Sequence, residues 1–327
     1  MGEENNTEAF GSGGLMAGTC THWMVVEEAL DRYNRLSQKH RYFPMILGLN
    51  HFVCLGAVGP DYPYLTELLD GFLKTHSWAD RMHYENSGEL IRNGIRYLPS
   101  IGVEGSDVCL AWLCGFATHL ITDSVIHPVV QAIVGPYIFN SGEHRHCELT
   151  QDSYIFHEIK GIELEYSRYV ELFKMCSDPR NADRINPSLR SFWPAALKAS
   201  HPGATPQQLD KIDPDKWHKN FISRIDSASD PVPVFRHFAE EKNLAYKKTT
   251  ELTQDERKRF IEEVTLPGNK TGHFKKDAFY KAVDTVIQTW GRLFVDIENK
   301  SPAGTNMYIK NWNLDTGVNE DQQDFWS

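Results

Sequence analysis

The amino-acid sequence predicts an all-α protein, because apolar residues recur at helical spacing in stretch after stretch of the chain. Strict alternation of apolar and polar residues between hairpin turns, which would predict strands, does not occur. The length of 327 residues and the hydrophobic content of 41% fit one large globular domain with an elaboration. We therefore expect a multi-helix bundle with an irregular, helix-containing C-terminal elaboration.

Helices in the first part of the chain are expected over residues 21–36, 43–58, 63–74, 87–98, 106–127 and 143–176. Thr21 is the expected N-cap of the first helix, since its hydroxyl can accept a hydrogen bond from a backbone N–H of the first turn. Gly59 and Pro60 end the second, because neither residue favours continuation of a helix. The last helix is amphipathic, and its length predicts a spine of the fold.

The helix over residues 106–127 is apolar nearly all round, which predicts that it lies at the centre of the bundle. Pro128 marks its end or a kink. Its apolar run contains Thr118 and His119 and is shorter than the roughly 18 apolar residues that a membrane span needs. We therefore expect a buried core helix and no transmembrane segment.

Beyond Asp178 the chain is rich in proline and charged residues, which predicts a more irregular C-terminal half. Two helices are expected there, over residues 253–264 and 277–298, and the second carries apolar side chains at helical spacing. From Asn311 onward the tail is polar and acidic. This change in composition divides the chain into a helical core and a C-terminal extension.

The 34 basic and 44 acidic residues give a net charge of −10, with the acidic excess at the two ends of the chain. This balance argues against nucleic acid or an anionic membrane surface as the main partner. The N-terminus lacks the basic and apolar regions of a secretory signal, which predicts a cytoplasmic protein unless a signal has been removed. The six cysteines form no Cys-x-x-Cys pair and are expected to be reduced.

The segment THLITDSVIHP places His119, Asp123 and His127 four residues apart, so that all three project from one face of the central helix. A single histidine on an apolar face is usually a core residue with a satisfied hydrogen bond. Three ionisable groups on one buried face cost several kcal/mol each unless a cation is present. The row therefore predicts a metal site.

A second segment, EHRHCELTQD, repeats this spacing with His144, Glu148 and Asp152 and turns His146 to the far side. Zn²⁺ accepts imidazole nitrogen and carboxylate oxygen, and helical bundles build such sites from inward-facing side chains. Carboxylates on amphipathic helices are usually solvated, which weakens both Glu148 and Asp152 as candidate ligands. Of the two, Glu148 is the stronger candidate. The choice between His144 and His146 stays open.

Three further candidates, His22, Asp61 and His83, are ambiguous one by one. Asp61 follows a Gly-Pro break, where an exposed turn aspartate would be ordinary. Tyr62 and Tyr64 lie beside it and could stack on a cationic head group, although ordinary packing would also explain them. These residues gain meaning only from the order of the whole set.

The sequence resembles the zinc-dependent phospholipase C family in the order of its motifs: THW around His22, GPD at Asp61, His83, THLITDSVIH and HRHCE. That family is related in fold to the S1/P1-type nucleases and to the N-terminal domain of glycosylphosphatidylinositol-specific phospholipase D. The resemblance covers residues 15–160 and implies an all-helical domain that holds metal ions. The expected organisation is a flexible N-terminus, a metal-binding helical core and a C-terminal helical extension with an acidic tail, over residues 1–14, 15–177 and 178–327.

The resemblance implies two or three ions of zinc. Imidazole and carboxylate ligands also suit iron or manganese, so these metals stay open as alternatives. The implied ligands are His22, Asp61, His83, His119, Asp123, His127, His144 and Glu148. One ion would lie among Asp61, His83, His119 and Asp123, a second between Asp123 and His22, and a third among His127, His144 and Glu148. Secreted relatives complete the second site with their mature N-terminus, whereas 21 residues precede His22 here.

The resemblance also implies a hydrolase that cleaves a phosphoester, with zinc-bound hydroxide as the nucleophile and Asp61 as the catalytic residue that orients or deprotonates the water. The expected partner is a phosphoester small molecule or a phospholipid head group, and nuclease activity is the least expected. Two alternatives stay open. The same residues could hold a redox metal for other chemistry on a soluble small molecule, or the metals could be structural in a non-catalytic binding module.

Overall fold

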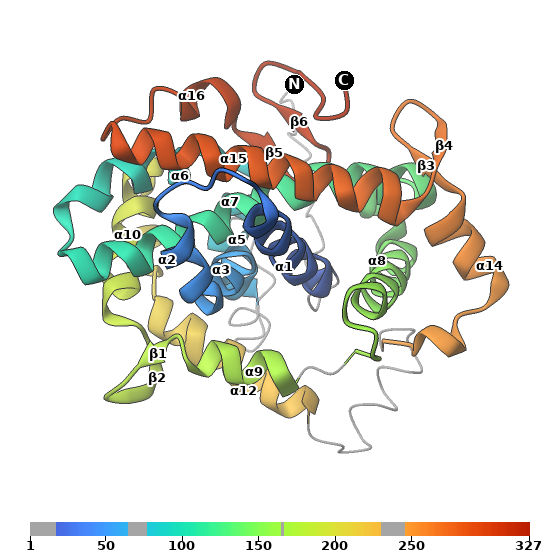
Figure 1. The fold of residues 1–327 in the computed structure, drawn as a ribbon, viewed down its shortest axis with the longest axis horizontal. Coiled ribbons are helices and arrows are strands. Elements are labelled where there is room, and N and C mark those ends of the chain that lie inside the picture. The colour runs from blue at the N-terminus through green and yellow to red at the C-terminus, as the bar shows by residue number, and fades with distance from the viewer. Residues whose placement is uncertain (1–17, 65–76, 165–166, 230–245) are drawn as a thin grey trace, which may run out of the picture.

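The structure, a computed structural model, describes residues 18–64, 77–164, 167–229 and 246–327. Over these residues the protein is all-α, as predicted, and its strands form only two-stranded antiparallel sheets. The helices surround α7 (Val103–Val134), the longest helix drawn in Figure 1. The N-terminus over residues 1–14, which we expected to be flexible, lies outside the described residues.

Helices that pack directly on α7 include α1 (Thr19–Arg35), α3 (Asn50–Gly56), α8 (Tyr137–Lys160), α10 (Pro187–Ser200) and α15 (Tyr280–Glu298). The contact with α3 is very close: a Cβ on Gly56 would lie 2.0 Å from the carbonyl oxygen of Trp112, and one on Gly115 would lie 2.0 Å from that of Val53. Only glycine allows the two backbones so near. This crossing fixes the end of α3, and the 3-10 turn that follows carries Asp61.

The start of α1 differs from the prediction. Gly18 is the N-cap residue, with a φ of 93° that glycine adopts readily. The carboxylate of Asp152 on α8 accepts hydrogen bonds from the backbone N–H groups of Gly18, Cys20 and Thr21 and from the Thr21 hydroxyl. Thr21 is therefore not the N-cap, because a buried carboxylate from another helix satisfies the donors of the first turn.

The predicted single helix over residues 43–58 is two helices, α2 (Phe43–Gly48) and α3. Leu49 between them has a φ of −107° and a ψ of 27°, which are not α-helical values. The apolar pattern continues across this residue, so the sequence shows no sign of the break.

The predicted spine over residues 143–176 is also divided. The helix α8 covers Tyr137–Lys160 with a kink at Asn140, whose φ of −137° and ψ of 36° are not helical, so its main part starts close to the predicted residue 143. It ends at Lys160, because Gly161 takes a left-handed φ of 69° that closes the helix. A separate helix, α9, covers Ser167–Lys174. No continuous spine exists within the described residues.

The central helix is longer than predicted, because Pro128 lies inside α7 and does not end it. Residues Gly105–Val134 have the length and composition to cross a membrane, with a mean hydropathy of 1.4, so the sequence-based argument against a span from its length does not hold. The apolar window of this helix is 100% buried inside the protein. Burial beneath other helices is what a core helix requires.

The remaining elements of the first half are α5 (Trp78–Tyr84), α6 (Ser87–Tyr97) and the 3-10 turns Gly59–Asp61 and Leu98–Ser100. The prediction of a helix over residues 87–98 is close to the observed α6. The helix predicted over residues 63–74 lies, beyond Tyr64, outside the described residues.

Two helices of the C-terminal half were not predicted, α10 and α12 (Pro214–Ser229). Both begin with a proline, Pro187 and Pro214, because the first turn of a helix tolerates a residue without a backbone N–H. In the sequence these prolines indicated only interruption. Short helical segments complete this half: α11 (Pro206–Leu209), α14 (Gln254–Arg257), α16 (Thr305–Tyr308) and the 3-10 turn Thr249–Glu251.

The helix predicted over residues 253–264 starts one residue later than expected, at Gln254 with Thr253 as its N-cap. It becomes a π-helix over Lys258–Glu262 and gives way to the strand that begins at Val264. The helix predicted over residues 277–298 is α15, preceded by a π-helical segment over Phe274–Phe279. The three small sheets pair β1 (Ser177–Asp178) with β2 (Asn181–Ile185), β3 (Val264–Leu266) with β4 (Lys270–Gly272), and β5 (Trp312–Asn313) with β6 (Val318–Asn319).

Candidate metal centre

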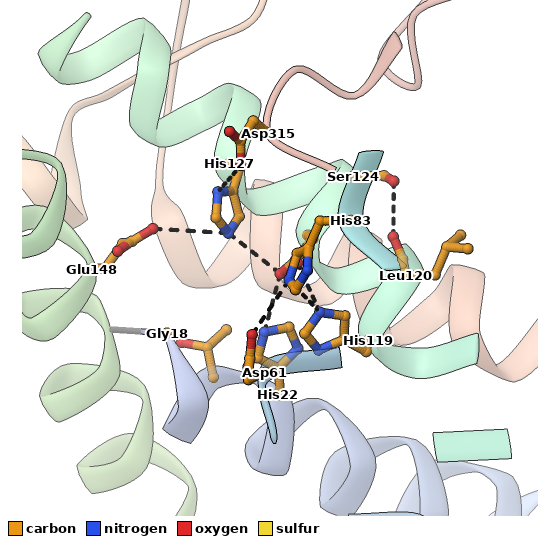
Figure 2. A network of polar contacts seen from close by, with 12 residues as sticks. Gly18, His22, Asp61, His83, His119, Leu120, Ser124, His127, Glu148 and Asp315 are labelled. Carbon is orange, nitrogen blue, oxygen red and sulfur yellow. Dashed lines mark hydrogen bonds and ion pairs between the residues drawn. The ribbon is translucent and has the colours of Figure 1, made fainter. Parts of the chain in front are cut away.

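The predicted row on α7 is centred on Asp123, a carboxylate that is 2% exposed. Figure 2 shows the histidines around it, His22, His83, His119 and His127, gathered in one place. Its Oδ1 lies 3.0 Å from Nε2 of His22 and 3.3 Å from Nε2 of His127. Its Oδ2 lies 3.0 Å from Nε2 of His119 and 3.7 Å from Nε2 of His83. One buried carboxylate therefore faces imidazoles from three helices, α1, α5 and α7.

Asp61 and two residues of α8, His144 and Glu148, lie beside these imidazoles. Oδ1 of Asp61 lies 3.3 Å from Nε2 of His83. Oε1 of Glu148 lies 3.3 Å from Nδ1 of His144 and 3.8 Å from Nε2 of His127. The fold thus brings all eight predicted ligands together.

Three groups of these residues have ligand atoms within 4.8 Å of one another: His22, Asp61 and His119; His83, His119 and Asp123; and His127, His144 and Glu148. The first two sets share His119, and the third set, which shares no residue with them, matches the implied third site. The first set groups His22 with Asp61 and His119, whereas the resemblance implies that His22 shares an ion with Asp123. Whether each residue is a ligand stays a prediction, since proximity alone does not place an ion.

The hydrogen bonds of two imidazoles test whether a cation fits. Nδ1 of His83 donates to the carbonyl of Ala79 over 2.8 Å, and Nδ1 of His119 donates to the carbonyl of Ala57 over 2.9 Å. The neutral rings must then carry lone pairs on both Nε2 atoms, which lie 3.2 Å apart. Two facing lone pairs at this distance require a cation or a proton between them. Imidazoles oriented by backbone carbonyls are typical of metal ligands.

Buried nitrogen atoms without a hydrogen bond point the same way. Nδ1 of His22 and Nε2 of His144 have no hydrogen-bond partner among the described residues, and Nδ1 of His144 lies 3.3 Å from Glu148 without the alignment of a hydrogen bond. Each such atom costs ~1–3 kcal/mol if it stays unsatisfied. A donor set of imidazoles and carboxylates in a buried helical site fits Zn²⁺.

The charges of the three carboxylates are held by their neighbours. Burial alone would raise the pKa of Asp123, but the imidazoles of His119, His127 and His22 outweigh burial and hold it well below its usual range. The same balance lowers the pKa of Asp61 and of Glu148. All three groups are therefore ionised at neutral pH.

The negative charges of these carboxylates raise the pKa of two neighbouring imidazoles. Burial disfavours their charged form, yet Asp61 and Asp123 raise the pKa of His83 to about 9. Asp123, followed by Glu148 and Asp315, raises the pKa of His127 to about 10. For His119 burial prevails and lowers the pKa. The centre attracts cations strongly, and a metal that binds there must displace protons.

A family comparison adds to this geometry. The family model described as zinc-dependent phospholipase C matches residues 21–203, which is more than half of the chain and includes all eight residues. The chain belongs to the zinc-dependent phospholipase C family. Neither a comparison with curated proteins nor one with solved structures found a match. Membership identifies zinc as the metal that this family uses.

In this member of the zinc-dependent phospholipase C family, a small cavity adjoins the metal ligands. Its lining residues are Gly18, Thr21, His22, Thr122, Asp123, Ile126, His127, Glu148 and Gln151. The cavity therefore lies between the start of α1, the middle of α7 and α8, at the boundary between the second and third implied ion positions.

Two candidates on α8 lie away from the centre. Nε2 of His146 lies 2.6 Å from Oε1 of Glu256, so the ring faces the C-terminal half, and His144 is the histidine that faces the centre. Asp152 continues the spacing of Glu148 but holds the start of α1, as described above. The weaker prediction for Asp152 as a ligand is not supported by its contacts.

The aromatic residues near Asp61 have structural contacts. Tyr62 is 0% exposed and stacks on Phe221, so it cannot stack on a head group. Tyr64 donates its hydroxyl to Asp80 over 3.0 Å, and its ring lies 5.4 Å from that of His83. The suggestion of a head-group platform at these tyrosines is wrong for Tyr62.

Sequence reasoning missed Asp315, which this family member places beside the ligands. Oδ1 of Asp315 lies 3.7 Å from Nδ1 of His127, and Oδ2 accepts a hydrogen bond from the hydroxyl of Tyr84 over 3.0 Å. The residue belongs to the tail that was described only as polar and acidic. It also lies beyond the matched range of the family, so no motif could have pointed to it.

Proposed function

We propose that the protein is a hydrolase that cleaves phosphoesters with the help of a multinuclear zinc centre. The observation that carries the proposal is the position of Asp123, whose oxygens lie within 3.7 Å of imidazoles from His22, His83, His119 and His127. A buried carboxylate shared in this way bridges ions readily. Membership of the phospholipase C family supports the same chemistry.

We assign the residues to ions as family membership implies. The first ion would be held by Asp61, His83, His119 and Asp123, the second by His22 and Asp123, and the third by His127, His144 and Glu148. The grouping of ligand atoms supports the third set, and the distance of 3.0 Å between Nε2 of His22 and Oδ1 of Asp123 supports the second. When bound, zinc supplies Lewis acidity toward phosphoryl oxygens and lowers the pKa of water to about 7. The protein supplies the positions of the donors and the negative charge that retains the ions.

Asp61 is best placed to orient the attacking water. Its side chain is 15% exposed, against 3% for Asp123, so it borders solvent. Its lowered pKa keeps it ionised, and an ionised carboxylate accepts a hydrogen bond from water and so orients it. Asp123 cannot take this role, because both of its oxygens face imidazoles.

The substrate class follows from the charges. A cluster of cations within a protein of net charge −10 attracts the phosphate of a small molecule or of a phospholipid head group locally. It offers a nucleic acid no broad basic surface. The finer choice, a phospholipid rather than a soluble phosphoester, is proposed from family membership alone.

The proposal is tested with purified protein on phosphatidylcholine vesicles and on a chromogenic phosphodiester, before and after chelation. We expect turnover to stop on chelation and to return with zinc. We expect His119→Ala to abolish it, because this imidazole faces both His83 and Asp123. His40→Ala is the control, since His40 pairs with Glu298 outside the centre.

Elemental analysis of the same preparation separates the competing explanations. Turnover that survives both chelation and His119→Ala would contradict the proposal. Iron or manganese in place of zinc would indicate different chemistry. Bound zinc whose removal unfolds the protein, with no hydrolysis of either substrate, would indicate a structural metal module.

A further inference from the structure

We propose that Asp315 is a positioning residue of the metal centre: its carboxylate receives the Nδ1–H of His127 and directs Nε2 of that ring toward an ion. The residue lies on the C-terminal hairpin, defined as residues 312–319, which consists of β5, β6 and their connection. The inference rests on the proposed metal centre, but it concerns a segment that the family match does not reach.

The C-terminal hairpin is attached to the helices that carry the ligands. The backbone N–H of Leu314 donates to the carbonyl of His83 over 3.0 Å. The side-chain amide of Gln131, one turn beyond His127 on α7, donates to the carbonyl of Asp315 over 2.7 Å. Asp315 is therefore held between α5 and α7, the two helices that carry His83 and His127.

The hairpin also fits the irregular part of α7. Pro128 has no backbone N–H, so the carbonyl of Ser124 lacks its usual helical donor. Gly317 lies against this place: a Cβ on it would lie 2.7 Å from Cγ of Pro128 and 2.8 Å from the carbonyl oxygen of Ser124. Gly317 also has a φ of 65°, which favours glycine. This fit fixes the hairpin one turn from His127.

The side chains are oriented for a contact between the two groups. Nε2 of His127 faces Asp123 and Glu148, so Nδ1 is the nitrogen on the outer side of the ring. This Nδ1 is buried and has no hydrogen bond among the described residues. Oδ1 of Asp315 lies 3.7 Å away, longer than a hydrogen bond, and Oδ2 is held by Tyr84.

Comparison with the imidazoles of His83 and His119 indicates what the contact between Asp315 and His127 does. His83 and His119 each donate Nδ1–H to a backbone carbonyl, which fixes Nε2 as the coordinating atom. Histidine ligands generally need such an acceptor. For His127, which lacks a carbonyl partner among the described residues, the carboxylate of Asp315 fills this place. A small rotation of His127 as it coordinates an ion closes the remaining gap.

The test measures zinc binding by competition with a chromophoric chelator, so it needs no substrate. We expect Asp315→Asn to weaken the binding of one ion by about 10–100-fold and to leave the others unchanged. Asp321→Asn is the matched control on the same tail, since Asp321 is exposed and pairs with Lys310. We expect it to bind zinc as the unmodified protein does.

Two further variants separate positioning from mere support of the fold. In a His127→Ala background, Asp315→Asn should have no further effect on zinc binding, because the group through which it acts is gone. Tyr84→Phe removes the hydroxyl that holds Oδ2 and should weaken the same ion by a smaller, several-fold factor. It also keeps the proposal testable if Asp315→Asn does not fold.

The outcomes distinguish this inference from the proposed function. Zinc binding by folded Asp315→Asn that equals that of the unmodified protein would overturn the inference, and so would an equal loss in Asp321→Asn or an undiminished effect in the His127→Ala background. A selective loss of one ion, in a protein that hydrolyses no phosphoester, would support the inference and contradict the function.

Discussion

The two sides of the candidate metal centre are built differently. On the side of Asp61, the imidazoles of His83 and His119 are fixed by backbone carbonyls. On the side of α8, neither His127 nor His144 has a backbone acceptor among the described residues, and their neighbours are carboxylates. The first side is therefore organised by the main chain, and the second by side chains that can be replaced.

This difference shows where the fold contributes to the chemistry. The carbonyl of Ala57 that holds His119 directly follows α3, whose close crossing with α7 depends on Gly56 and Gly115. The first side thus inherits the rigidity of the core. The second side depends on the C-terminal hairpin and α8, so its affinity can be changed without disturbing the core.

Removal of the carboxylate that joins both sides should have the largest effect. Asp123→Asn replaces a charge shared by four imidazoles with a neutral amide. We expect phosphoester turnover to fall by ~10³-fold or more and the zinc content to drop, because several kcal/mol of charge stabilisation are lost. Steady-state kinetics and metal analysis check this. Retention of full zinc content would contradict the view that Asp123 joins the ions.

A methyl group at the helix crossing should disturb the first side alone. Gly115→Ala places a Cβ 2.0 Å from the carbonyl oxygen of Val53, and because that atom is backbone the helices must separate. We expect the free energy of unfolding to fall by about 3 kcal/mol or more, with weaker zinc binding at His119. Urea denaturation and chelator competition measure the two effects.

Gly142→Ala on α8 is the matched control for this substitution. A Cβ on Gly142 meets nothing within 4 Å, and the residue lies in the first turn of α8 after a kink at Asn140. We expect Gly142→Ala to change the free energy of unfolding by less than ~1 kcal/mol, because the methyl group meets no neighbouring atom. A loss of stability equal to that of Gly115→Ala would show that the crossing is not the cause.

The pH dependence of stability should distinguish a residue that supports the first side, His218, from the metal ligands. Burial lowers the pKa of His218 to about 4, and this ring contacts Ser177 and the hydroxyl of Tyr62, next to Asp61. Because the folded pKa lies below the unfolded value of about 6.5, the unfolded state takes up the proton first. The contribution of the neutral His218 to the free energy of unfolding is complete above pH 6.5 and is lost as the pH falls toward 4.

From pH 7 to pH 5 we expect this histidine to remove ~2 kcal/mol from the free energy of unfolding. The protonation of the metal ligands contributes as well, so the comparison must be with His218→Gln, which keeps polar groups but does not titrate. Urea denaturation at both pH values gives the difference. An identical loss in the variant would assign the whole pH dependence to the centre.

The sequence alone predicted the row of ligands on α7, because the positions of side chains along a single helix follow from its regular geometry. The spacing of His119, Asp123 and His127 placed them on one face of α7 without knowledge of the fold. His22 and His83 could be joined to them only through the order of motifs in a family. Contacts between distant segments have no such periodic signal.

The wrong predictions from the sequence concern features that depend on backbone angles or on distant segments of the chain. The break at Leu49 and the end of α8 at Gly161 depend on backbone angles that the apolar pattern does not report. Asp152 has the spacing of a ligand but caps α1, because another helix happens to start beside it. Asp315 was invisible, since a β-hairpin far along the chain carries it to the centre.

The smallest effect is expected at His146, and it tests the side-chain half of the comparison most finely. His146 lies two residues from His144 on α8, but its ring pairs with Glu256, which also binds Lys247. Glu256 is buried, but it keeps the hydrogen bonds that it accepts from Lys247 and Thr253 when the ring is lost, so His146→Gln should cost only ~1 kcal/mol of stability. It should leave zinc binding and turnover unchanged, whereas His144→Gln should weaken one ion. Equal zinc binding by the two variants would contradict the conclusion that His144, and not His146, faces the centre. It would also contradict the assignment of the third ion to His127, His144 and Glu148.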